Sequence, residues 1–174
     1  MTDHDFRAMF EEHKDAVYQF AWRMTNSPAL AEDIAQDVFL LVWRGEAELD
    51  ASRGTIRSLL LGIARNLAWK HWRRDRRLSS LNDDEIAAAS TAIESLDKNQ
   101  ALSAAVAALP PLQREALVLV TYEEMSLQEI ADLLTIEVGT VKARLYRARE
   151  NLKLLLAPCR PGDVRSEKEY GTAK

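Results

Sequence analysis

Residues that interrupt helices are few in this chain and lie mainly between segments with helical apolar periodicity. The 174 residues include 6 glycines and 5 prolines, and the prolines stand at positions 28, 110, 111, 158 and 161. Because glycine and proline mark turns and boundaries, this spacing favours long helices over strands joined by tight turns. Hydrophobic residues make up 47% of the chain, which is enough to build helical cores. We therefore expect an all-α fold.

Three predicted helices fill the first 77 residues. The first spans about 5–25, the second begins at Ser27–Pro28 and ends near 43, and the third spans about 55–77. Ser27 followed by Pro28 is typical of a helix N-cap with proline in the first turn. On the second helix the apolar residues at helical spacing are Leu30, Ile34, Val38 and Leu41. Such helices can bury these faces against one another, so residues 1–77 are predicted to form one small domain.

The composition changes between residues 78 and 97. This segment contains no basic or aromatic residue and is rich in alanine, serine and aspartate. We predict a flexible linker here, with a short helix within it as the alternative. Residues 98–157 then form a second helical domain, and residues 158–174 form a flexible polar tail. The helices predicted in the second domain span about 101–109, 112–122, 126–134 and 138–156.

A helix-turn-helix motif lies near the end of the second domain. Ser126 stands three residues before Glu129, which is the capping-box pattern of a helix start. The short helix is followed by a three-residue turn, 135–137, and by a longer helix that begins at Val138. In proteins with this motif the second helix enters the major groove of DNA.

Charge is distributed unevenly along the sequence, although the net charge is −4. Residues 1–50 hold eleven acidic and four basic residues, a net charge of −7. Residues 65–77 hold six basic and one acidic residue, or +5, and residues 142–153 hold five basic and one acidic residue, or +4. Clustered basic residues indicate contact with nucleic acid, so the two separated blocks predict two DNA contacts.

The helix after Val138 has a basic face opposite its apolar stripe. The residues predicted to contact DNA there are Lys142, Arg144, Tyr146, Arg147 and Arg149. Lysine and arginine side chains bind guanine edges and phosphates. The alternative is an ordinary solvated basic face, and for Tyr146 simple packing. The helix-turn-helix spacing favours DNA binding.

The helix predicted over 55–77 combines aromatic and basic side chains on one face. Aromatic rings can stack on unpaired bases beside basic groups that bind phosphates. For the tryptophans, Trp69 and Trp72, packing in the core is an equal alternative. The residues predicted to contact DNA are Arg65, Asn66, Trp69, Lys70, Arg73, Arg74, Arg76 and Arg77.

The helix predicted over 27–43 carries acidic groups beside apolar residues outside its buried stripe. Its candidate partner-binding residues are Asp33, Gln36, Asp37 and Leu40. Acidic residues in a first turn can simply complement the helix dipole, but that does not account for Asp37 and Leu40. We therefore predict a protein-binding surface.

Other classes of protein are disfavoured by what the sequence lacks. The single cysteine, Cys159, excludes an intramolecular disulfide framework and indicates a reducing, cytoplasmic setting. The N-terminus is too polar for a signal peptide, and no apolar run is long enough to span a membrane. The three histidines share no metal-ligand spacing, and no glycine-rich phosphate loop or nucleophile motif occurs. We expect no cofactor, no metal site and no enzymatic activity.

Three segments together resemble the extracytoplasmic-function sigma factors of the sigma-70 family. They read AEDIAQDVFLLVW at 31–43, RGTIRSLLLGIARNLAWKHWRRDRR at 53–77, and LPPLQREALVLVTYEEMSLQEIADLLTIEVGTVKARLYRARENL at 109–152. The resemblance covers both predicted domains and implies a transcription initiation factor that binds core RNA polymerase and promoter DNA. It also implies regulation by an anti-sigma factor.

The resemblance implies a role for each surface. Asp33, Gln36 and Asp37 would dock on the clamp coiled coil of the largest polymerase subunit. The segment 53–77 would bind the −10 element, with Asn66 in the position that lines the pocket for a flipped-out base. The helix from Val138 would bind the −35 element. There, the side chains directed toward bases are Lys142 and Arg147, and those directed toward phosphate are Arg144 and Arg149.

Three residues depart from the family pattern. Leu59 stands where tryptophan is common, which puts an aromatic role there in doubt. Thr135 stands where the turn commonly has glycine, and a β-branched residue is costly if φ is positive. Glu137 stands where serine or proline is common, which weakens the cap of the following helix. The alternatives are a sigma-like decoy that sequesters an anti-sigma factor and a stand-alone helix-turn-helix regulator.

Overall fold

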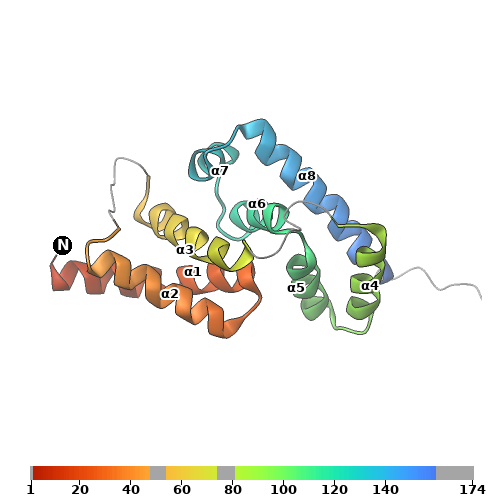
Figure 1. The fold of residues 1–174 in the computed structure, drawn as a ribbon, viewed down its shortest axis with the longest axis horizontal. Coiled ribbons are helices and arrows are strands. Elements are labelled where there is room, and N and C mark those ends of the chain that lie inside the picture. Colours follow the sequence, from red (N-terminus) through yellow and green to blue (C-terminus); the bar gives the residue numbers. More distant parts are fainter. Residues whose placement is uncertain (1, 48–53, 74–80, 160–174) are drawn as a thin grey trace, which may run out of the picture.

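In the computed structural model, which describes residues 2–47, 54–73 and 81–159, the regular secondary structure is helical (Figure 1). This confirms the predicted all-α fold. The elements are α1 Asp3–Thr25, α2 Pro28–Trp43, α3 Ile56–Trp72, α4 Asp83–Glu94, α5 Lys98–Ala108, α6 Pro111–Thr121, α7 Leu127–Leu134, α8 Val138–Leu155 and the short 3₁₀ helix η2 Ala157–Cys159. They form two groups, α1 to α3 and α4 to η2.

The first group is a three-helix bundle whose helix ends are set by local sequence. Asn26 ends α1 in the left-handed conformation, with φ 53°, and the Ser27 side chain then accepts a hydrogen bond from the backbone of Leu30. Proline at position 28 is the first residue of α2, as the sequence predicts. The fully buried side chains at the centre of the bundle include Phe20, Met24, Ile34, Val38 and Leu60.

Within the predicted linker, 78–97, residues 83–94 form the helix α4, so the short helix given as the alternative is present and most of the segment is not flexible. Asn82 and Glu85 form a capping box that starts α4, and this helix packs against α5, α8 and η2. Ile86, Ala89 and Ile93 lie on the packed side, with Ile93 only 3% exposed. These positions lie on one face of the helix. The apolar stripe is weak, so α4 is stabilised mainly by packing this face against α8. Residues 158 and 159 of the predicted tail, 158–174, belong to η2. The rest of that tail, 160–174, and residues 74–80 lie outside the described residues.

The helix-turn-helix forms from α7 and α8, packed on α6. The Ser126–Glu129 capping box starts α7 as predicted. Thr135 ends α7 with φ 55° and ψ 49°, which is the left-handed conformation that is costly for a β-branched residue. Glu137 is the N-cap of α8 and makes no side-chain capping bond, which agrees with the weak cap predicted there.

Replacing Thr135 by glycine is expected to raise the free energy of unfolding by about 1 kcal/mol, because a β-branched residue is strained at positive φ and glycine is not. Urea denaturation followed by circular dichroism measures the change. The matched control is Asn26→Gly at the end of α1, where φ is 53°. Asparagine tolerates this conformation, so the control should gain less. Equal gains at both positions would contradict strain at Thr135.

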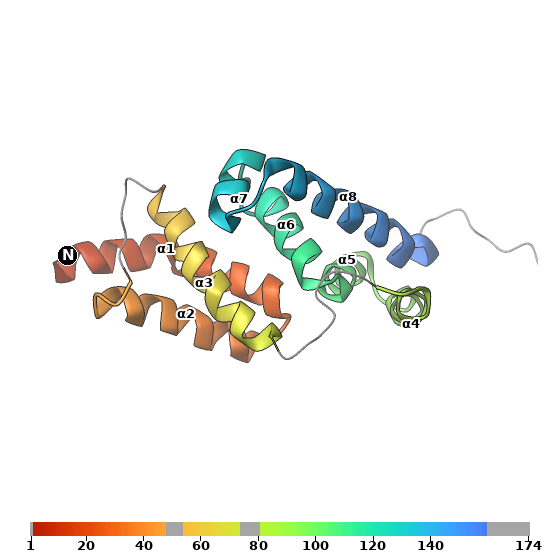
Figure 2. The same cartoon turned by 45° about the horizontal axis from the view of Figure 1, so that its top comes forward.

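The two groups of helices are in contact through α6, which lies at the centre of the molecule between α3 and α8 (Figures 1 and 2). Arg114 of α6 is buried and donates to the backbone carbonyls of Met24 at 2.7 Å, Leu109 at 3.0 Å, and Ala107. Burial lowers the pKa of Arg114 to about 10, so the guanidinium remains charged at neutral pH. A buried cation therefore ties the end of α1 to the second domain.

Candidate functional site

The basic face of α8, defined as Lys142, Tyr146, Arg147 and Arg149, is exposed to solvent. Its opposite side carries Val141, Leu145 and Ala148, which are buried. The Tyr146 side chain is 67% exposed, so packing does not explain an aromatic residue there. Three cations and one aromatic ring are thus presented to solvent on the second helix of the motif, and side chains of these types bind base edges and phosphates in DNA-binding proteins.

Arg144, the fifth residue predicted on this helix, points inward. Its side chain is only 16% exposed, and Nη1 lies 3.4 Å from Oε2 of Glu115 on α6. Burial lowers the pKa of Arg144, and the nearby Glu115 carboxylate opposes that effect. The family resemblance implies a phosphate contact for this residue, but in the structure its partner is a carboxylate of the same chain.

A cavity of about 430 Å³ opens between the start of α6 and the first turns of α8. Gly139 and Thr140 line it together with Arg147 and Arg144. The side chain of Glu137, the N-cap residue of α8, accepts no hydrogen bond from the backbone amide groups of this first turn. A helix N-terminus beside arginines is suited to an anionic oxygen such as a phosphate of the DNA backbone.

The predicted DNA-contacting residues of α3 divide into two sets. Asn66, Lys70 and Arg73 are exposed. Arg65 and Trp69 are directed toward the second domain, where both donate to Glu115. Trp72 packs edge-on against Trp69, with 5.2 Å between ring centroids. The other predicted residues, Arg74, Arg76 and Arg77, lie outside the described residues.

An acidic stripe of exposed residues runs along α2: Asp33, Gln36, Asp37 and Leu40. It lies beside the buried residues Ile34 and Val38, and the Leu40 side chain is 44% exposed. Trp43, one turn further along, is 50% exposed. Acidic and apolar groups at this spacing form a continuous surface that a partner helix can contact.

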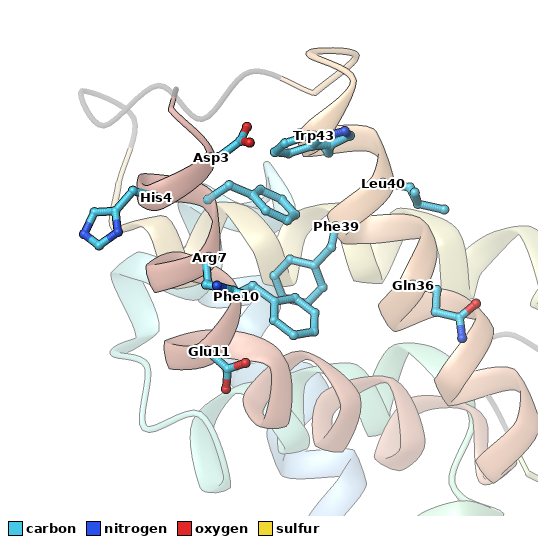
Figure 3. A pocket seen from close by; sticks show the side chains of 10 residues that line it. Asp3, His4, Arg7, Phe10, Glu11, Gln36, Phe39, Leu40 and Trp43 are labelled. Carbon is cyan, nitrogen blue, oxygen red and sulfur yellow. The ribbon is translucent and has the colours of Figure 1, made fainter.

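An apolar groove of about 1030 Å³ adjoins this stripe, between the start of α1 and the end of α2 (Figure 3). Phe10 lies edge-on to Phe39, and Phe6 lies edge-on to Trp43, each pair with 4.8 Å between ring centroids. Sequence reasoning missed this groove. The signal was present as aromatic pairs four residues apart, Phe6 with Phe10 and Phe39 with Trp43, which antiparallel helices bring together.

Glu115 is a second feature that sequence reasoning missed. This residue is 0% exposed, and its Oε1 accepts from Arg65 Nε at 2.5 Å and from Trp69 Nε1 at 2.7 Å. Its Oε2 faces Arg144. These partners lie 29 to 50 positions away in the chain, so no local pattern announces the cluster.

Across residues 2–47, 54–73 and 81–159, no group of three or more histidine, cysteine, aspartate or glutamate side chains could hold a metal ion. Among the helices of the described segments, none combines the length and apolar content needed to cross a membrane.

Comparison with known proteins matches both domains. Residues 9–78 match the family model described as Sigma-70 region 2, and residues 99–152 match the model described as Sigma-70, region 4. The ECF RNA polymerase sigma factor SigW of Bacillus subtilis is 31% identical over 164 residues, covering 85% of this chain and 87% of SigW. SigM of the same organism is 27% identical over 152 residues, covering 84% of this chain and 92% of SigM.

Solved structures share the fold. The sigma factor RpoE from Bartonella quintana, in complex with the anti-sigma factor NepR, is 24% identical with a TM-score of 0.68, covering 90% of this chain and 99% of RpoE. CnrH, in complex with the cytosolic domain of CnrY, is 25% identical with a TM-score of 0.60, covering 90% of each chain.

Proposed function

Because the chain belongs to the extracytoplasmic-function group of the sigma-70 family, we propose that it binds core RNA polymerase and directs it to promoters. The observation that carries this proposal is the exposed basic face of α8 on a helix-turn-helix, in a chain whose first domain has a basic helix of its own. A stand-alone regulator has no need of the second DNA-binding helix or of the acidic stripe. The chain itself performs no catalysis.

Each surface has a part in this function. The acidic stripe on α2 contacts the clamp coiled coil of the largest polymerase subunit. The exposed end of α3, with Asn66, Lys70 and Arg73, binds the −10 element, and the basic face of α8 binds the −35 element. Each contact alone is weak, and joining the domains in one chain raises the effective concentration of the second contact. The protein acts in the cytoplasm, where polymerase and chromosome are found.

An anti-sigma factor regulates this activity in our proposal. CnrH, which shares the fold, is described in complex with the cytosolic domain of CnrY. The apolar groove between α1 and α2 adjoins the acidic stripe, so a protein seated there would also cover residues proposed to bind polymerase. Binding of polymerase and of such a regulator would then be mutually exclusive.

Run-off transcription with purified core polymerase on a promoter library tests the proposal. The expected result is transcripts from a defined subset of promoters only when the chain is added, with an amount that falls steeply as salt increases. Core polymerase alone is the control. A chain that supports no transcript while it still binds purified anti-sigma candidates would instead be a decoy. This alternative is favoured by the positive φ of Thr135 and by the missing side-chain cap at the start of α8.

A further inference from the structure

One buried carboxylate joins the two helices that are proposed to bind DNA. Glu115 accepts hydrogen bonds from Arg65 and Trp69 on α3, and its other oxygen faces Arg144 on α8. The three donors are partly or largely covered, with the Arg65 and Arg144 side chains 22% and 16% exposed. We call these four residues the Glu115 cluster. In this arrangement Arg65 and Arg144, which are both predicted to contact DNA, share one carboxylate of the same chain.

The Glu115 cluster is incompatible with simultaneous binding of both promoter elements. Arg65 and Arg144 contact the same carboxylate, at 2.5 Å and 3.4 Å. The −10 and −35 elements are separated by roughly 25 base pairs, or about 85 Å at 3.4 Å per base pair. The helices α3 and α8 therefore have to separate before each can lie on its own element.

Two other contacts show that the closed arrangement is closely fitted. Glu123, whose side chain is 2% exposed, lies 2.7 Å from Arg57 and 4.0 Å from Arg23. Gly62 of α3 approaches α7 so closely that a Cβ atom there would lie 3.2 Å from Cδ1 of Leu133. A side chain at position 62 would therefore crowd Leu133 at the contact between the two domains.

We propose that Glu115 holds the unbound protein in a closed, self-inhibited state by occupying Arg65, Trp69 and Arg144. This inference rests on the proposed function, because it assumes that α3 and α8 bind DNA. Carboxylate and phosphate oxygens bind the same N–H edge of a guanidinium group, so DNA competes directly with Glu115. Opening exposes Glu115 to water, and its hydration offsets much of the lost ion pairing. Polymerase and DNA together can therefore open the protein.

Two variants open the cluster by different physical means. Glu115→Gln keeps the size of the side chain and removes its charge, which leaves Arg65 and Arg144 as neighbouring cations. Gly62→Gln leaves the cluster chemically intact and places a side chain against Leu133. The control, Glu94→Gln on α4, removes the same charge as Glu115→Gln from an exposed position. A higher DNA affinity caused only by lost negative charge would therefore appear in the control as well.

Domain opening is measured by energy transfer between dyes on the full chain. Cysteines replace Glu12 on α1 and Leu154 on α8, whose side chains are 74% and 52% exposed, and the single native Cys159 is replaced by serine. Circular dichroism checks that each variant keeps its helices. DNA affinity is measured by fluorescence anisotropy with a 30-base-pair duplex of random sequence, which requires neither a promoter nor polymerase.

The expected result is lower transfer efficiency in both Glu115→Gln and Gly62→Gln, with duplex binding about tenfold tighter than in the parent. The parent itself should lose transfer when the duplex is added, and Glu94→Gln should match the parent. Unchanged transfer in both variants, or opening without tighter DNA binding, would overturn the proposal. These readouts are separate from run-off transcription, so the closed state and the initiation function can fail independently.

Discussion

Replacing Asp37 by arginine is expected to reduce promoter-dependent run-off transcription about 100-fold or more. Asp37 is exposed in the middle of the acidic stripe on α2. The nearby Ile34 and Val38 are buried, and Leu40 at the end of the stripe is exposed. Reversing a charge at a complementary interface places like charges opposite each other, which costs several kcal/mol. A loss of about 2.7 kcal/mol corresponds to 100-fold in binding. The stability of the protein should change by less than about 0.5 kcal/mol, because the side chain lies at the surface.

The same variant separates polymerase binding from DNA binding. Co-purification with core polymerase should be lost, whereas anisotropy with a random duplex should not weaken. Glu94→Arg on α4 reverses the same charge at an exposed position outside the stripe and should retain transcription. Normal co-purification of the Asp37→Arg protein would show that polymerase docks elsewhere.

The second large effect is expected from replacing Lys142 and Arg147 together by alanine. Both side chains lie on the exposed basic face of α8, so their removal leaves the buried stripe of that helix unchanged. A base contact contributes about 1–3 kcal/mol, and two such losses should reduce transcription about 100-fold at a promoter that depends on its −35 element. Alanine favours helix, so α8 should remain folded.

The salt dependence of DNA affinity distinguishes the loss of phosphate contacts from the loss of base contacts. Loss of a phosphate contact lowers the slope of log affinity against log salt by about one, whereas loss of a base contact mainly reduces sequence preference. Lys153→Ala is the matched control, because Lys153 is an exposed cation two to three turns further along α8 and pairs with Glu150. A double variant that transcribes as well as this control would remove α8 from −35 recognition.

The sequence predicts the helices of this protein where their starts are local. Ser27–Pro28 and Ser126–Glu129 place the first residues of α2 and α7 correctly, because a cap depends on neighbours within one turn. The same rule would have located α4, since Asn82 and Glu85 form an identical kind of cap. The segment was expected to be a linker because its composition is polar. The apolar face that stabilises it is complete only when α5 and α8 pack against it.

The candidate site was predictable to the extent that it depends on helical periodicity. The exposure of Lys142, Tyr146 and Arg147 follows from the buried stripe on the same helix. The position of Arg65 does not follow in this way, because its partner Glu115 lies 50 residues away on another helix. Pairing between charged residues in separate domains depends on how those domains pack, and periodicity within one helix carries no information about that.

The bond from Arg114 to the Met24 carbonyl spans 90 residues of sequence. A bacterial ribosome adds about 5–20 residues each second, so Met24 is synthesised roughly 5 to 18 s before its partner. Trp72, the last residue of α3, is synthesised 42 residues before Arg114, so α3 is complete about 2 to 8 s before that part of the second domain is made. If the closed form acts as proposed, a polymerase that is present during translation would meet α3 before the second domain covers it.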